Sequence, residues 1–158
     1  MTGSGDLEAV GVGRRSSFLP LLRLADESVD HVEAHLDEGE LFAWTAVGAM
    51  VGAVQAVPRT PSLWELTLVA VAEEFQRRRH GTEMLTAVID SLAARGARRI
   101  VVGTASAGVG QLAFYQRAGF RVFAVDRDHF DRARGYTGNE SENGIVIRDL
   151  VWLDRLLP

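Results

Sequence analysis

The chain of 158 residues contains no cysteine, and all 17 of its basic residues are arginines, so lysine is absent as well. The missing thiols exclude disulfides, thiolate metal sites and a cysteine nucleophile, and they fit a reducing compartment such as the cytoplasm. The missing lysine excludes a P-loop lysine and a Schiff base with pyridoxal phosphate or a carbonyl substrate. Several large enzyme classes are therefore ruled out by absences alone.

An excess of positive charge is also lacking, because the formal net charge is −4. Nucleic acids and anionic membranes need a positive face, so neither is an expected partner. Residues 1–13 hold no basic stretch followed by an apolar one, so we expect no secretory signal and a cytoplasmic location. The longest apolar run, residues 41–57, is shorter than the roughly 20 residues that span a bilayer.

What remains is the composition of an ordinary globular protein, with 47% hydrophobic, 24% charged and 8% aromatic residues. A chain of this length buries roughly two-thirds of its unfolded surface and suits one domain, here residues 1–158. The apolar run 41–57 reads as a hairpin, with strands 41–47 and 50–57 around a Gly48-Ala49 turn.

Further elements follow from periodicity and capping. The opening residues alternate weakly and are either an edge strand or a lead-in, and residues 18–25 form a short element. Asp30 is expected to cap a helix that Gly39 follows. From residue 63 onward strands and helices alternate, which predicts an α/β fold. The expected elements are strand 63–71, helix 81–95, strand 98–104, helix 110–118, strand 120–126, loop 128–143 and a final strand within 145–157.

The most informative stretch lies between strand 63–71 and the helix that follows it. Residues 76–82 read Gln-Arg-Arg-Arg-His-Gly-Thr. A glycine-containing turn at a helix start offers free backbone N–H groups and the positive end of the helix dipole, which suit a phosphate. The alternative is a solvated basic first turn.

This stretch resembles the cofactor loop of the GNAT superfamily of N-acetyltransferases, Gln/Arg-x-x-Gly-x-Gly/Ala. Gln76, Arg79 and Gly81 occupy the marked positions, although Arg79 stands where the family has its first glycine. Residues 111–120, QLAFYQRAGF, are similar to the family's A-x-x-FY-x-x-x-GF stretch. The resemblance covers about residues 40–126 and implies a GNAT-like fold, with a mixed, mostly antiparallel sheet of six or seven strands flanked by helices.

The resemblance also implies acetyl-CoA as cosubstrate. The pantetheine arm, with its two amides, pairs like an extra strand where sheet strands splay apart. The implied cofactor-binding residues are Val69, Ala70 and Val71 along the arm, Gln76, Arg77, Arg78, Arg79, His80, Gly81 and Thr82 around the pyrophosphate, and Gln111. The family often has Asn where this chain has Gly108, and either Ser106 or Gln111 supplies the missing polar contact.

Acetyl transfer to an amine needs an unprotonated nucleophile and a proton for the departing thiolate. By its position Tyr115 is the family's general acid, and the alternative is a core tyrosine beside Phe114. Glu65 is the candidate general base if it points into the cleft with Thr67, Val69 and Val71, and otherwise it faces solvent. His129 and Glu142 are reserve candidates for the base.

His31 and His35 lie four residues apart on the expected helix, a spacing that two metal ligands can share. The glutamate between them, Glu33, stands one position away from its place in the H-E-x-x-H zinc motif, and Val32 and Ala34 offer no ligand. A solvated helix face is therefore the preferred interpretation, and no metal is expected.

The sequence thus predicts an acetyl-CoA-dependent N-acetyltransferase acting on a small-molecule amine. The alternatives are a protein or peptide N-acetyltransferase and a non-catalytic acyl-CoA-binding module. A homodimer is suggested by analogy with the family alone.

Overall fold

A seven-stranded sheet organises the computed structural model, which describes residues 5–26 and 29–158. The strand order is β1-β2-β3-β4-β5-β9-β6, and only β4 and β5 run parallel to each other. The predicted mixed, mostly antiparallel sheet is therefore confirmed. The strands are β1 (Asp6–Val10), β2 (Glu40–Ala46), β3 (Ala49–Pro58), β4 (Leu63–Val71), β5 (Arg99–Ala105), β6 (Arg121–Asp126) and β9 (Leu150–Leu156).

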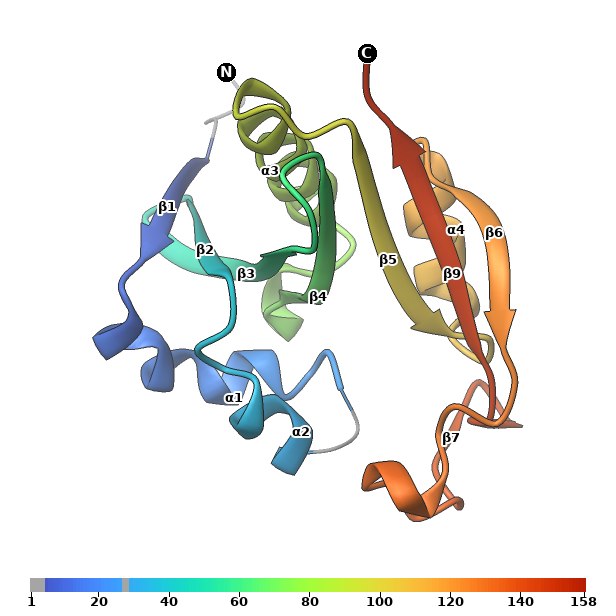
Figure 1. Cartoon of the computed structure of the whole chain (residues 1–158). Helices are drawn as coiled ribbons and strands as arrows, with labels where there is room; N and C mark the ends of the chain where they lie inside the picture. The colour runs from blue at the N-terminus through green and yellow to red at the C-terminus, as the bar shows by residue number, and fades with distance from the viewer. Residues whose placement is uncertain (1–4, 27–28) are drawn as a thin grey trace.

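Helices cover both faces of this sheet (Figure 1). The apolar stripe of α3 (His80–Ala94) packs into one buried cluster with β2, β3, β4 and β5. On the opposite face, α1 (Leu19–Leu22) and α2 (Val29–Ala34) cover a second cluster. The remaining helix, α4 (Val109–Arg117), lies over β5, β9 and β6. Short 3₁₀ turns span Val12–Phe18, Glu73–Phe75 and Arg132–Arg134.

The hairpin between β2 and β3 turns one residue earlier than the sequence suggests. Its two turn residues are Val47 and Gly48, with φ of 49° and 76°, and Ala49 already belongs to β3. A type I′ turn needs positive φ at both central residues, and its twist matches that of the flanking strands. Strand twist therefore overrides the poor fit of valine to this conformation.

The edge-strand alternative for the opening residues is confirmed, because β1 lies at the end of the sheet and pairs with β2. Two other local expectations need adjustment. Asp30 lies inside the first turn of α2 and is not its cap. The region expected to be loop 128–143 and one final strand contains a small hairpin, β7 (Ser141–Glu142) and β8 (Ile145–Val146), before β9 begins at Leu150.

A β-bulge divides β4 into two halves with opposite side-chain orientation. Gln55 of β3 pairs with Leu68, whereas the next residue, Ala56, pairs with Leu66, so Thr67 is an extra residue in β4. Beyond the bulge, Val69 and Val71 pack on the α3 side, and Leu68 and Ala70 pack on the α1–α2 side. The expectation that Glu65 shares one face with Val69 and Val71 is wrong, because the bulge reverses the alternation between them.

Pairing between β4 and β5 stops shortly before the bulge. The last matched residues are Leu66 and Val102, and beyond them the two parallel strands separate. The backbone of residues 69–71 still pairs with β3 on one edge, but its edge toward β5 has no strand partner. The sheet is thus open in its middle, with polar backbone groups along the opening.

Candidate functional site

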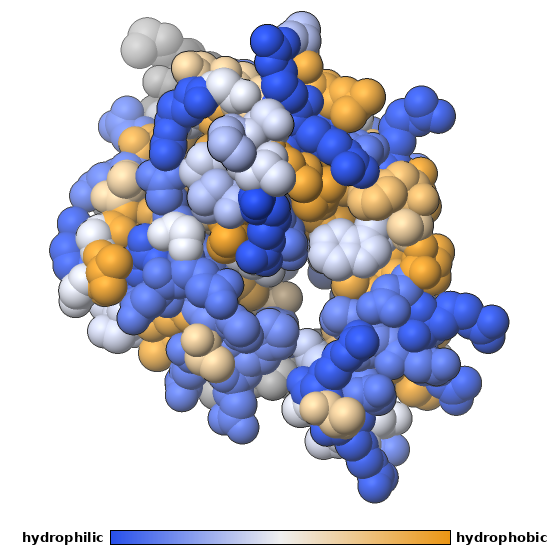
Figure 2. All heavy atoms as spheres, viewed as in Figure 1, coloured by the Kyte–Doolittle hydropathy of each residue, from blue (hydrophilic) through white to orange (hydrophobic). Residues whose placement is uncertain are grey.

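A cleft of about 510 Å³ occupies the opening between β4 and β5. Figure 2 shows the molecule hollowed between the α1–α2 segment and the loop that carries β7. Residues from the α1–α2 connection, the middle of β4 and β5, α4 and the segment after β6 line this cleft. A polar substrate that entered it would meet side chains from both halves of the split sheet.

Tyr115 of α4 lines the cleft although only 6% of its surface is exposed. Its ring packs edge-on against Phe114 and Phe120, with centroid separations of 5.2 and 5.7 Å. No group in the described part of the chain forms a hydrogen bond with the Tyr115 hydroxyl. Burial raises the pKa of this phenol above its ordinary value. The core-tyrosine interpretation and the general-acid interpretation are therefore compatible. The Tyr115 ring is part of the core, and its unpartnered hydroxyl lies at the cleft.

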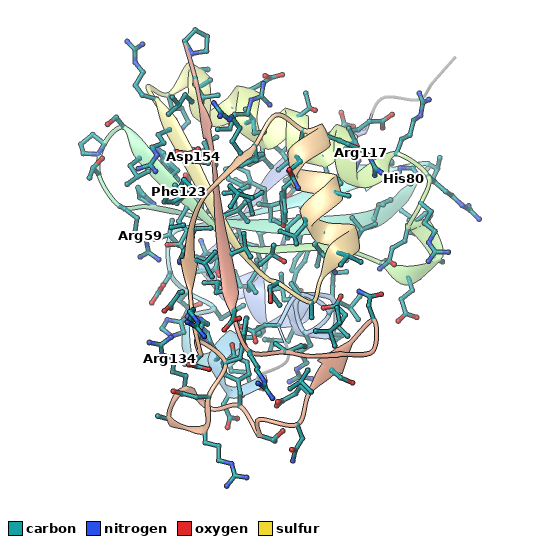
Figure 3. The ribbon with its side chains drawn as sticks, turned by 90° about the vertical axis from the view of Figure 1, so that its right-hand side faces the viewer. Arg59, His80, Arg117, Phe123, Arg134 and Asp154 are labelled. Carbon is teal, nitrogen blue, oxygen red and sulfur yellow. The ribbon has the colours of Figure 1, made fainter. Side chains whose placement is uncertain are left out.

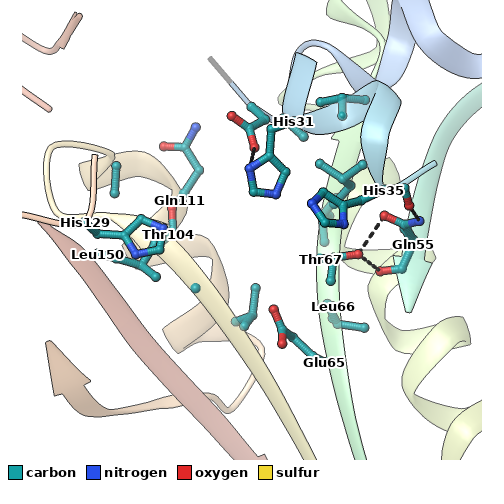
Figure 4. Close-up of a pocket in the computed structure, with 18 of the residues that line it drawn as sticks. His31, His35, Gln55, Glu65, Leu66, Thr67, Thr104, Gln111, His129 and Leu150 are labelled. Carbon is teal, nitrogen blue, oxygen red and sulfur yellow. Dashed lines mark hydrogen bonds and ion pairs between the residues drawn. The ribbon is translucent and has the colours of Figure 1, made fainter. Parts of the chain in front are cut away.

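Glu65 also lines the cleft, and Figure 4 shows its carboxylate directed into it. It lies on β4 before the bulge, and its side chain is about 20% exposed. The guanidinium of Arg59 donates to Glu65 Oε1 at 3.0 Å and holds the carboxylate in place. The solvent-facing alternative for Glu65 is thereby replaced by a cleft-facing, ion-paired carboxylate.

The reserve candidates His129 and Glu142 line the same cleft from the segment after β6. His129 Nδ1 lies 2.7 Å from Asp126 Oδ2, and its ring packs edge-on against Phe130. The His129 hydrogen bond is the main reason why the pKa of Asp126 lies below its ordinary value, with Arg134 adding to it. Geometry thus brings every candidate acid and base into one space.

His31 and His35 line the cleft as well, with ring centroids 4.6 Å apart. Their side chains are 44% and 46% exposed, so they form part of the cleft wall and not only a solvated helix face. His35 Nδ1 lies 2.6 Å from Glu38 Oε1. Among residues 5–26 and 29–158, no group of three or more potential ligand side chains is arranged to hold a metal ion.

Two buried polar side chains fix the wall that carries these histidines. Gln55 of β3 donates from Nε2 to the carbonyl oxygens of His35 and Glu38, at 2.7 and 3.0 Å. Arg15 donates to the carbonyl oxygens of Glu38 and Gly39, at 3.2 and 2.9 Å. Together these two buried side chains give hydrogen-bond partners to the carbonyl groups that follow α2 and hold this segment in place.

The loop before α3 has the features of an anion site. The backbone N–H groups of residues 79–82 donate no hydrogen bond to any described group, as expected at the start of a helix. Arg77 and Arg79 have φ of 63° and 67°, in the left-handed region that glycine prefers. This strain costs roughly 1–2 kcal/mol per residue. Arg79 thus adopts the backbone conformation expected of the glycine that the family has at this position.

Two other members of the predicted loop have defined environments. The Gln76 side chain donates from Nε2 to the carbonyl oxygen of Val71 at 2.9 Å, which fastens the loop to the end of β4. A Cβ atom added to Gly81 would lie 3.4 Å from its nearest neighbours, Phe114 and Val71, which is an ordinary van der Waals contact. Residues 76–82 do not line the cleft. Val69, near the end of the strand that leads to this loop, does line it.

Gln111 occupies the space next to Gly108. A Cβ atom built on Gly108 would lie 2.9 Å from Gln111 Oε1. Gln111 also lines the cleft, whereas Ser106 does not. Of the two candidates for the missing polar contact, Gln111 is therefore the one that the fold brings to the opening.

Several cleft residues were not foreseen from the sequence. Arg59 lies in the β3–β4 loop, and the Tyr136 hydroxyl donates to Asp26 Oδ1 at 3.0 Å across 110 residues of chain. No local spacing links such distant positions, so only the fold reveals them.

Comparison with known proteins identifies this architecture. Residues 15–120 match the Acetyltransferase (GNAT) family. The chain is 35% identical over 144 residues to the uncharacterized N-acetyltransferase YvbK of Bacillus subtilis (strain 168), covering 91% of this chain and 92% of the relative. The chain therefore belongs to the GNAT acetyltransferase family.

Two solved structures show the same fold over 98% of this chain and 99% of their own length. One is a GNAT family acetyltransferase from Elizabethkingia anophelis with acetyl-CoA bound, with a TM-score of 0.88 and 28% identity. The other is a Bacillus subtilis acetyltransferase in complex with CoA, with a TM-score of 0.87 and 32% identity. The protein is an acetyl-CoA-dependent acetyltransferase. None of the helices in its described part is long and apolar enough to cross a membrane.

Proposed function

We propose that this enzyme acetylates the amine of a small cationic molecule, with Tyr115 as general acid and Glu65 as general base. The observation that carries the proposal is the charge of the cleft that both residues line. Among the described residues that line it, four carry carboxylates and one, Arg59, carries a guanidinium. The carboxylates belong to Asp26, Glu38, Glu65 and Glu142. Such a wall attracts a cation and repels an anion.

The size of the cleft supports a small acceptor. Its volume of about 510 Å³ lies within the usual range of small-molecule sites, roughly 300–1,000 Å³. Apolar side chains such as Trp152 and Phe130 line it beside the carboxylates. This mixture suits an alkyl chain with more than one amino group.

The residues around the opening fit the donor. The free N–H groups of residues 79–82 and the arginines before them suit a pyrophosphate. The strand edge of residues 69–71 is free to pair with the amides of the pantetheine arm. A donor bound in this way would present its thioester inside the cleft, next to Tyr115.

The proposed reaction forms a bond between the amine nitrogen and the acetyl carbon and breaks the bond between that carbon and sulfur. Glu65 accepts a proton from the acceptor ammonium group, directly or through a water molecule, and Arg59 keeps its carboxylate oriented. Tyr115 donates its phenolic proton to the departing thiolate and regains a proton, directly or through water, from the nitrogen, which loses its second proton as the amide forms. The transfer requires no covalent attachment to the enzyme.

Burial disfavours the negatively charged form of both the proton donor, Tyr115, and the leaving group, the thiolate. The apolar surroundings that raise the pKa of Tyr115 also disfavour a negatively charged thiolate beside it. Donation of the proton removes the charge from the sulfur at the point where it is least well solvated. The raised pKa also keeps Tyr115 protonated throughout the neutral pH range.

A panel of acceptors assayed with acetyl-CoA tests this proposal. The readout is free thiol, which has no protein background because the chain lacks cysteine. We expect kcat/KM to be highest for diamines and polyamines, lower for monoamines and lowest for amines with a carboxylate. Preference for peptide N-termini would favour the protein-acetylating alternative. Acetyl-CoA binding without turnover of any amine would favour the binding-module alternative.

A further inference from the structure

Strand β6 leaves an apolar edge on the surface of the described structure. It is the last strand of the sheet, and β9 is its only strand neighbour. Val122, Phe123 and Val125 are 50%, 48% and 55% exposed. Figure 3 views this side of the molecule, with Phe123 on β6 and Asp154 on the adjacent β9. Natural proteins rarely leave such an edge uncovered, because it is a template for pairing with another strand.

The exposed side chains lie on both faces of the strand. Val122 and Val125 are opposite Leu153 and Val151, which are buried in the core cluster, so these two valines point to the α4 face. The Arg99 guanidinium lies 4.7 Å from the centre of the Phe123 ring, on the face where Arg99 also binds Asp154. A partner that covered one face only would leave half of this apolar surface in water.

The orientation of the side chains along β6 reads the same in both directions. Arg121 is opposite Asp154, and Asp126 is opposite Leu150, so both point away from α4. The register shift between Val122 and Ala124 makes Phe123 the extra residue, and Phe123 and Ala124 point to that same face. The order from 121 to 126 is therefore away, toward, away, away, toward, away with respect to α4.

A second copy of the same strand matches this order. We infer that β6 pairs antiparallel with β6 of another copy of this chain, around a two-fold axis between Phe123 and Ala124. Each residue is then opposite one that points to the same face: Val122 opposite Val125, and Phe123 opposite Ala124. The two sheets become one continuous sheet, and the contact is the same surface on both copies, as a two-fold dimer requires.

Charge complementarity supports the same register. Arg121 of one copy is opposite Asp126 of the other, at each end of the paired strands. Arg121 forms no ion pair with any described residue, whereas Asp126 already lies near His129 and Arg134. The negative charge of Asp126 is thus placed to receive a further cation from the partner copy. A parallel arrangement would not bring these two charges opposite each other.

Cysteine cross-linking tests the register directly, because the natural chain has no cysteine. Val122→Cys and Val125→Cys are prepared separately with different affinity tags, mixed, and oxidised. Cα atoms of directly opposite residues are about 4.5–5.5 Å apart, within reach of a disulfide. The same residue in the two copies is offset by three positions along the strand, about 10 Å, which is too far. We expect a disulfide-linked dimer in the mixture and not in either variant alone.

The mass in solution provides the second measurement. The wild-type chain should have twice the chain mass by light scattering, and Val125→Glu should reduce it to the monomer mass. Val12→Glu is the matched control, because Val12 is 57% exposed and follows β1, the strand at the opposite end of the sheet from β6. Circular dichroism confirms that the variants are folded. A monomeric wild-type chain, or a dimer without the cross-link specific to the mixture, would overturn the inference.

Discussion

The hydroxyl of Thr67 donates a 2.8 Å hydrogen bond to Oε1 of Gln55, across the bulge where β4 reverses its side-chain alternation. The same Gln55 side chain donates from Nε2 to the carbonyl oxygen of His35. One buried amide therefore joins the bulge to the wall of the cleft.

Replacement of that amide should cost stability. In Gln55→Leu the Thr67 hydroxyl and the carbonyl groups of His35 and Glu38 lose a partner in partly buried surroundings, at about 1–3 kcal/mol. Urea unfolding measures the loss. Thr67→Ser keeps the hydroxyl and is the control, expected within about 0.5 kcal/mol of wild type. A Gln55→Leu variant as stable as that control would show that the hydrogen bonds contribute nothing net.

Gly81→Asp should weaken acetyl-CoA binding by at least about tenfold. A carboxylate at the start of α3 repels the pyrophosphate proposed to bind there, and like charges in contact cost several kcal/mol. Gly81→Ala should bind almost as wild type, because its Cβ meets only ordinary contacts at 3.4 Å. Calorimetry measures the acetyl-CoA affinity of both variants, and the difference between them separates the effect of the added charge from that of the added side-chain volume. Equal affinities for the two variants would place the pyrophosphate elsewhere.

Tyr115→Phe should lower kcat by about a hundredfold or more while acetyl-CoA affinity stays near that of wild type. The phenyl ring still fills the space between Phe114 and Phe120, so only the proton donor is lost. Stopped-flow measurement of the chemical step gives the rate, and calorimetry gives the affinity. An unchanged rate would leave Tyr115 with a packing role alone.

Tyr115 should also resist ionisation at alkaline pH. The chain has two tyrosines, so Tyr136→Phe leaves Tyr115 as the only phenol to follow by ultraviolet absorbance. Its pKa is raised on folding, so above about pH 10 the unfolded chain loses this proton while the folded chain keeps it. Stability should then fall by up to about 1.4 kcal/mol per pH unit. Ionisation near pH 10 in the folded state would contradict the burial of the hydroxyl.

Glu65→Gln should make turnover depend more steeply on pH. Without a general base, the reaction needs an acceptor that arrives unprotonated, and an alkyl amine gains about tenfold in free base per pH unit below its pKa of about 10.4. The wild-type profile should flatten at lower pH. Arg59→Gln is the companion variant, because it keeps the carboxylate but removes its ion pair. Superimposable profiles for wild type and Glu65→Gln would transfer the role to His129, Glu142 or water.

Local pattern was sufficient for the regular elements near the cofactor loop. Strand β4 spans the predicted residues 63–71, and α3 begins one residue before the predicted helix and ends before Gly96, whose φ is 97°. These elements depend on neighbours in sequence: apolar periodicity, helix propensity and a glycine at the exit. The order of the loop and the QLAFYQRAGF stretch likewise indicated the family before any fold was known.

The cleft could not be predicted in the same way. Alternation placed Glu65 with Val69 and Val71, but a single extra residue at Thr67 reversed the second half of β4, and a bulge has no reliable local signature. The turn at Val47 and Gly48 shows the same limit, because the twist of the two strands places Val47 at a positive φ that valine disfavours.

The sequence by itself determined the family, the donor and the position of Tyr115, because these depend on residue types at fixed spacing within one loop and one helix. Only the tertiary structure decided that Glu65 faces the cleft, that Arg59 holds it, and that distant carboxylates such as Asp26 and Glu142 join it there. The physical reason is that segments far apart in sequence set the electrostatics of this cleft, and they meet there because of strand registers and of the separation of β4 from β5, which no short stretch of sequence contains.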